Sequence, residues 1–140
     1  METYKHKVQY YETDKMGITH HSNYIRWMEE ARVNRLEKIG WSFEKLENLG
    51  MLSPVVEIKC KYMNSTKFND LVEIKVILKE YNGVKLIVKY EMINLKTREI
   101  VLKGESTHCF ITKQGKIISI KKEYSDFDKS LMKELSKIGE

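Results

Sequence analysis

The residues best suited to chemistry lie in one polar stretch near the N-terminus, between Tyr10 and Tyr24. Asp14 supplies a carboxylate, and Gly17 lets the chain turn tightly behind it, because glycine tolerates a positive φ. A helical pattern begins where the stretch ends. Because a helix N-terminus has unpaired backbone N–H groups and a partial positive charge, it can polarise a carbonyl. A carboxylate facing a polarised carbonyl is a minimal acyl-transfer site.

Other chemistries fit this stretch less well. Asp14, His20 and His21 lack the spacing of metal ligands, so no metal site is expected. No serine lies in a Gly-x-Ser-x-Gly turn, which disfavours a serine hydrolase. A purely structural reading stays open, because an aspartate before a helix is ordinarily a turn residue and Ser22 and Asn23 are good N-cap residues.

One long helix must follow this loop. Apolar side chains recur with helical spacing from Asn23 to Ile39, and Gly40 is placed to end the helix in the left-handed conformation. The predicted buried arc contains Tyr24, Ile25, Met28, Ala31, Leu36 and Ile39. A short helix or turn is expected from Ser42 to Leu49.

The rest of the chain alternates with the period of strands. A first strand is expected at 4–12, and others at 56–62, 72–78, 84–92 and 100–112, with Asn82-Gly83 as a hairpin turn. A last apolar stripe, from Tyr124 to Ile138, predicts a terminal helix capped by Ser125 that docks onto the sheet or onto a partner subunit. This order predicts a single α+β domain over residues 1–140.

Composition excludes several classes of protein. The chain has 25 basic and 20 acidic residues, a net charge of +5 that suits a phosphate-bearing small molecule as readily as a nucleic acid. The basic residues alternate with acidic ones, so nucleic-acid binding is not expected. No apolar run approaches the roughly 18 residues of a membrane span. Cys60 and Cys109 form no Cys-x-x-Cys pair, which predicts buried, reduced thiols and a cytoplasmic protein.

A resemblance makes these expectations more specific. The chain contains Asp14-x-x-Gly17-x-x-x-His21-x-Asn23-Tyr24-x-x-Trp27-x-Glu29-x-Ala31-Arg32. This pattern resembles the signature of the 4-hydroxybenzoyl-CoA thioesterase family. Two later segments depart from the family pattern, since Ser65 stands where a proline is common and the segment from Gly115 to Lys121 lacks both of its prolines.

The resemblance implies a hotdog fold, in which an antiparallel sheet of about five strands wraps a long central helix. It implies hydrolysis of an acyl-CoA thioester, with Asp14 as nucleophile or general base and the backbone N–H of His21 polarising the thioester carbonyl. The substrate-binding residues would be Gly17, His20, Asn23 and Tyr24. Coenzyme A would be part of the substrate, and no cofactor is expected.

It also implies a homodimer or homotetramer, with the active site at a subunit interface. Two alternatives stay open. The substrate could be a thioester of an acyl carrier protein, for which a basic surface would suit an acidic partner. The protein could also be a non-catalytic module that binds an acyl ligand or another protein, although pure binding has no need of the Asp14 carboxylate.

Overall fold

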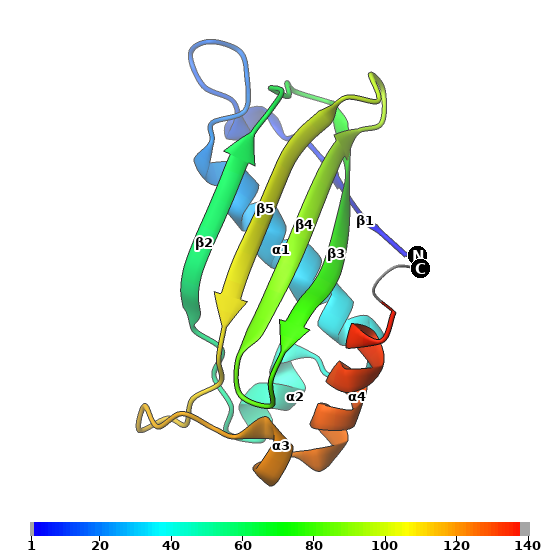
Figure 1. Ribbon diagram of the computed structural model, residues 1–140. Helices are drawn as coiled ribbons and strands as arrows, with labels where there is room; N and C mark the ends of the chain where they lie inside the picture. Colours follow the sequence, from blue (N-terminus) through cyan, green and yellow to red (C-terminus); the bar gives the residue numbers. More distant parts are fainter. Residues whose placement is uncertain (1, 138–140) are drawn as a thin grey trace.

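The computed structural model describes residues 2–137, in which a long helix lies across one face of a five-stranded antiparallel sheet (Figure 1). The elements in chain order are β1 (Tyr4–Lys7), the 3-10 turn η1 (Tyr10–Glu12), α1 (Ser22–Lys38), α2 (Phe43–Asn48), β2 (Val55–Tyr62), β3 (Leu71–Tyr81), β4 (Leu86–Asn94), β5 (Ile100–His108), α3 (Ile120–Glu123) and α4 (Ser125–Leu135). The predicted α+β order, one long helix with five strands and a terminal helix, is confirmed.

The strands are ordered β1-β3-β4-β5-β2, and every neighbouring pair is antiparallel. The turn at Asn82-Gly83 joins β3 to β4 as predicted, with Gly83 at a φ of 93°. β2 follows the helices in the chain but pairs with β5 at the far side of the sheet. Its outer edge therefore has no partner strand within residues 2–137.

The first strand is shorter than predicted. Its pairing with β3 ends at Lys7, and residues 10–12 form η1 instead of continuing the strand to Glu12. The reason is local: the backbone N–H of Gln9 donates to the Glu12 carboxylate at 2.8 Å, which closes a turn. The last strand likewise ends at His108, before the predicted Thr112.

The main core lies between α1 and the sheet. Side chains spaced three or four residues apart along α1 are buried: Tyr24, Trp27, Met28 and Ala31. They pack with Val72, Ile74, Tyr90, Met92 and Leu102. Burying a large apolar side chain contributes about 1.5–3 kcal/mol, so this face of α1 fixes the helix on the sheet. Ile25, predicted to be in the buried arc, is 39% exposed.

A second core forms at the C-terminal end of α1, where α4 docks against β3 as predicted. Phe127 and Leu131 of α4 are buried there with Trp41 and Phe110. The prediction that Ser125 caps this helix is wrong, because Tyr124 occupies the N-cap position and no side chain caps it. Ile138, the last residue of the predicted stripe, lies outside the described residues.

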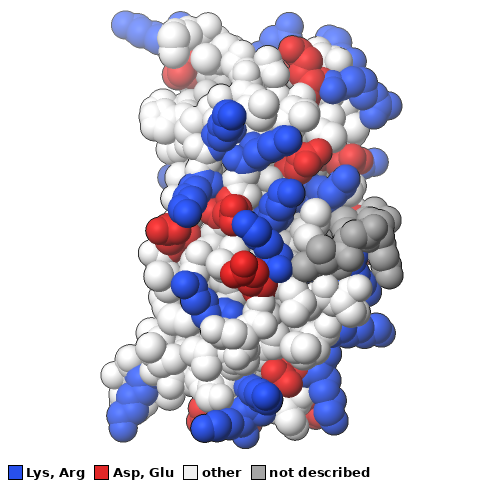
Figure 2. All heavy atoms as spheres, in the orientation of Figure 1, with Lys and Arg blue, Asp and Glu red and all other residues white. Residues whose placement is uncertain are grey.

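The outer face of the sheet carries charges of both signs. Figure 2 shows Lys and Arg side chains interspersed with Asp and Glu on the side that the strands present in Figure 1. An example is the ion pair between Lys79 and Glu105, at 3.0 Å. Cys60 and Cys109 are free thiols, but both are partly exposed rather than buried. No helix within residues 2–137 has the length and apolar character needed to cross a membrane.

Candidate active site

A short loop between η1 and α1 holds Asp14. The loop is closed by a bridge between Thr13 and Thr19 and by a hydrogen bond from the Asp14 N–H to the Ile18 carbonyl at 2.8 Å. Gly17 has a φ of +80°, and its N–H donates to the Asp14 carbonyl at 3.0 Å. The tight turn predicted for Gly17 is therefore present. In Figure 1 this loop projects beyond the end of the sheet.

Asp14 stabilises the turn with one carboxylate oxygen and leaves the other oxygen available for chemistry. Its Oδ1 accepts the backbone N–H of Met16 at 2.8 Å, which fixes the side chain in the loop. Its Oδ2 accepts no hydrogen bond from the part of the chain that the structure describes. Because the side chain is partly exposed, this second oxygen is free to meet a substrate or a water molecule.

The N-terminus of α1 begins beside this loop. The N-cap residue is His21, with φ −55° and ψ −27°, rather than the predicted Ser22 or Asn23. The N–H of Asn23 is satisfied by the His20 carbonyl at 3.0 Å. In residues 2–137 no acceptor pairs with the backbone N–H of His21, which is an exposed residue. This N–H is an unpaired donor at the positive end of the helix.

Hydrogen bonds join the start of the Asp14 loop to the N-terminal end of α1. The N–H of His20 donates to the Glu12 carbonyl at 2.8 Å, and the buried Asn23 side chain donates to the same carbonyl at 3.0 Å. Residue 12 therefore lies beside residue 20, which brings Asp14 and His21 to one end of α1. The His20 ring is exposed and stacks on the His21 ring with a centroid separation of 4.5 Å.

Tyr24 supports the site from inside the core. Its side chain is 4% exposed, and its hydroxyl pairs with the hydroxyl of Thr66 at 3.1 Å. Thr66 also pairs with the Thr19 hydroxyl at 2.6 Å and accepts the Thr19 N–H through its carbonyl. The segment between β2 and β3 is thus joined to the Asp14 loop. Substrate-binding roles for Gly17, His20, Asn23 and Tyr24 stay predictions.

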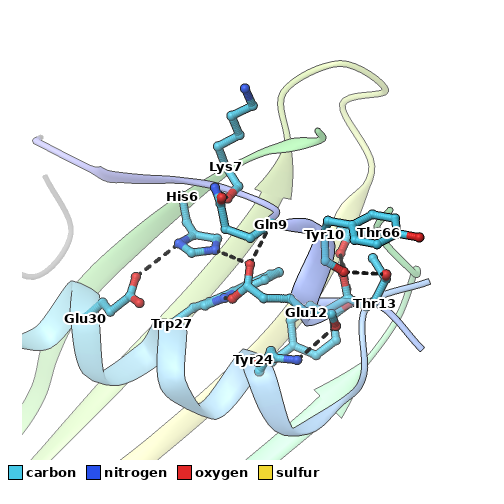
Figure 3. Close-up of polar contacts among 12 residues, drawn as sticks. His6, Lys7, Gln9, Tyr10, Glu12, Thr13, Tyr24, Trp27, Glu30 and Thr66 are labelled. Atoms are coloured by element: carbon cyan, nitrogen blue, oxygen red, sulfur yellow. Dashed lines mark hydrogen bonds and ion pairs between the residues drawn. The ribbon is translucent and has the colours of Figure 1, made fainter. Parts of the chain in front are cut away.

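A second carboxylate, that of Glu12, lies near the loop and has no role predicted from the sequence (Figure 3). It is 4% exposed and its Oε1 bonds His6 Nε2 at 2.8 Å and the Gln9 N–H at 2.8 Å. Its Oε2 accepts the Trp27 indole N–H at 2.6 Å, and His6 also contacts Glu30 at 3.1 Å. Both oxygens are occupied, so Glu12 braces the loop against α1 and leaves Asp14 as the carboxylate with a free oxygen.

These contacts also control the charge of Glu12. Burial alone would raise the pKa of this carboxyl, but hydrogen bonds from His6, the Gln9 backbone and Trp27 outweigh burial and the pKa is lowered. One sequence signal could have revealed the turn. A glutamate three residues after a polar residue is the spacing at which a side chain reaches back to an N-cap N–H, and Gln9 and Glu12 have that spacing.

Glu12→Gln is expected to destabilise the fold by about 2 kcal/mol, because an amide replaces a charged acceptor of several hydrogen bonds. Since the Glu12 pKa is lowered on folding, its contribution is present above the ordinary value of 4.5 and is lost as pH falls below it. Urea unfolding of both proteins between pH 7 and pH 3 measures this. Curves that keep the same separation at every pH would contradict the role given to Glu12.

Comparisons with known proteins agree with this architecture. A family model described as the thioesterase-like superfamily matches residues 8–135. A Bacillus subtilis (strain 168) protein named "Putative acyl-CoA thioesterase YneP" is 33% identical over 122 residues, which are 86% of this chain and 88% of that protein. A protein of Aquifex aeolicus (strain VF5) named "Putative esterase" is 37% identical over 120 residues, 86% of this chain and 91% of that protein.

Solved structures give the same result. The DHNA-CoA thioesterase of Staphylococcus aureus superposes with a TM-score of 0.89 at 29% identity, covering 94% of this chain and 88% of that one. The resemblance read from the Asp14 motif is confirmed, and so is the hotdog fold. Acyl-CoA thioesterase activity is supported at the level of the family. The chain belongs to the thioesterase-like superfamily of hotdog-fold enzymes.

Proposed function

We propose that the protein hydrolyses an acyl-CoA thioester to a free acid and coenzyme A, with Asp14 and the backbone N–H of His21 acting on the reacting carbonyl. One observation carries this proposal. A carboxylate oxygen and a backbone N–H, both without partners in residues 2–137, are brought to the same end of α1 by the bonds between residues 12 and 20. Each supplies one half of an acyl-transfer site.

The Asp14 carboxylate and the His21 N–H have different roles in the reaction. As oxygen attacks the carbonyl carbon, negative charge develops on the carbonyl oxygen, and the His21 N–H stabilises it. Asp14 either attacks the carbonyl carbon itself, forming a mixed anhydride that water then cleaves, or accepts a proton from the attacking water. In both cases the C–S bond breaks and the thiolate leaves and takes up a proton. Trapping of an acylated Asp14 would distinguish the first route from the second.

Hydrolysis changes no oxidation state, so no redox cofactor is needed, and we propose that the carboxylate and the backbone donor act without a metal ion. A positioned base contributes about 10²–10⁴ in rate and an oxyanion donor about 10²–10³. Together these factors are sufficient for a thioester, which is already an activated acyl group. The test is thiol release from a panel of acyl-CoAs by the purified protein. Release at the background rate for every member would contradict the proposal.

We further propose that the active form is a homodimer or a larger homo-oligomer. The outer edge of β2 carries unpaired backbone groups, and a second copy could pair with it. Apolar side chains are also exposed on β2 and around the Asp14 loop, including Val56 at 60%, Tyr11 at 81% and Met16 at 76%. Light scattering during size exclusion would measure the mass, and a monomer with full activity would contradict this assembly.

Carrier-protein thioesters are the alternative substrates. The same carboxylate and N–H would act on them, since the thioester is identical and only the carrier differs. Rates on one acyl chain, offered first on CoA and then on an acyl carrier protein, decide between them. A higher kcat/KM for the CoA thioester is the result that we expect.

The conformation of Gly17 gives a test of how much the loop matters. Gly17→Ala forces a side chain into a φ of +80°, which costs about 1–2 kcal/mol and shifts the turn that holds Asp14. We expect kcat to fall several-fold. Gly115→Ala is the matched control, because Gly115 has a φ of +86° in a turn away from the loop and has similarly open space around it. Equal activity losses in the two variants would show that strain at the Asp14 turn has no special effect.

A further inference from the structure

A cavity lies near the C-terminal end of α1, away from the active site. It is enclosed by the second half of α1, by β3, β4 and β5 and by α4, and its volume of about 60 Å³ opens partly to solvent. Its walls are mostly aliphatic and aromatic, including Leu36, Val76, Val88 and Phe110. Arg32 lines it, roughly 16 Å along the helix from His21 at about 1.5 Å per residue. The cavity is therefore separate from the Asp14 loop.

Arg32 places a buried positive charge beside this cavity. It is 7% exposed, its Nη1 donates to the Tyr90 hydroxyl at 3.2 Å, and its buried Nε has no acceptor in the described part of the chain. No carboxylate of residues 2–137 lies within 4 Å of the guanidinium. Glu134 also lines the cavity, but it is already paired with Arg35 at 2.5 Å and with Lys137 at 2.9 Å. A buried cation without a counter-charge costs several kcal/mol.

A chain of hydroxyl groups leads from Arg32 to a second buried nitrogen. The Tyr90 hydroxyl pairs with Ser106 Oγ at 2.7 Å, and Ser106 Oγ pairs with His108 Nε2 at 2.6 Å. Arginine can only donate. Arg32 therefore donates to the Tyr90 hydroxyl, which donates to Ser106 Oγ. The Ser106 hydroxyl then donates to His108 Nε2. That arrangement leaves the imidazole proton on Nδ1.

His108, which also lines the cavity, is consequently a neutral imidazole. Burial, together with the charge of Arg32, lowers the pKa of this imidazole to about 4, although the Pro54 carbonyl nearby opposes the shift. The buried Nδ1 has no acceptor with hydrogen-bond geometry in the described residues. Within the described chain, Arg32 is thus a positive charge without a counter-charge beside a cavity whose walls are mostly apolar.

We propose that this cavity is a second ligand site, which binds a small organic acid with its carboxylate at Arg32 and its apolar chain against the aliphatic wall. A carboxylate supplies the counter-charge that Arg32 lacks, and it can accept from the terminal N–H groups of the guanidinium. A phosphate ester would match the donors, but its polar oxygens would face the apolar wall. An aliphatic acid matches both parts of the site.

Calorimetric titration with octanoate, and with octanamide as the uncharged analogue of equal length, tests this site on the full-length protein without any turnover. We expect one octanoate per chain, bound at least about tenfold more tightly than octanamide. Arg32→Met keeps an unbranched stem and should remove that preference. Arg26→Met removes an equal charge from an exposed position on α1 and should keep it.

The wild-type protein supplies a readout that does not depend on a variant folding. Octanoate should shift the NMR signals of His108, Phe110 and Leu131, and it should leave those of Gly17 and His21 unchanged. Asp14→Asn should bind octanoate as the wild type does. Shifts confined to the Asp14 loop, or equal affinity for octanoate and octanamide, would overturn the second site while leaving the proposed hydrolysis untouched.

Discussion

Asp14→Asn is expected to lower kcat by about 10²–10⁴-fold, the usual contribution of a positioned catalytic base. Asparagine has nearly the same shape, and its side-chain oxygen can still accept the Met16 N–H that holds the turn. The loss would therefore come from the missing charge and basicity and not from a displaced loop. The measurement is the rate of thiol release at saturating acyl-CoA, compared with wild type.

A matched variant separates this effect from a general change in charge. Asp126 is an exposed carboxylate in the first turn of α4, remote from the Asp14 loop in the fold, and Asp126→Asn should keep wild-type kcat. Circular dichroism and unfolding in urea would show whether each variant keeps its structure. Full activity of a folded Asp14→Asn protein would remove Asp14 from the mechanism.

His21→Pro is expected to lower kcat by about 10²–10³-fold, because proline has no backbone N–H to stabilise the developing negative charge. The φ of His21 is −55°, close to the value that the proline ring imposes, so this position can accept the ring. His21→Ala keeps the N–H and removes only the imidazole, and it should retain most of the activity. The comparison of the two variants measures the backbone donor separately from the side chain.

Two outcomes would contradict this assignment. If His21→Ala lost as much activity as His21→Pro, the imidazole and not the amide would be the active group. If a folded His21→Pro protein kept wild-type kcat, the carbonyl would be polarised elsewhere. Since a proline can also disturb the residue before it, the backbone conformation of His20 should be checked by NMR in both variants.

The parts of the fold that could be predicted depend on local patterns. The helix over residues 22–38 follows from side chains repeated along its buried face, such as Tyr24, Met28 and Ala31. The turns at Gly17 and Gly83 follow from the freedom of glycine to take a positive φ. The Asp14 motif could be read because its residues lie close together in the sequence and next to the predicted start of a helix.

What could not be predicted depends on contacts between distant segments. The alternation around Glu12 predicts a strand, whereas the conformation of Glu12 is fixed by contacts with Trp27 and His6. Arg32 belongs to the Asp14 motif, but its bonded partner is the hydroxyl of Tyr90, 58 residues away. No periodicity in the sequence indicates that a helix residue and a residue of the fourth strand will meet in this way.

The most direct test is a crystal structure with a non-hydrolysable acyl-CoA analogue in which a methylene group replaces the thioester sulfur. The proposed mechanism predicts that the ketone oxygen lies about 2.7–3.1 Å from the backbone nitrogen of His21. It also predicts that the free oxygen of Asp14 faces the carbonyl carbon from the opposite side. A ketone bound to other donors, or an Asp14 carboxylate turned away from that carbon, would contradict it.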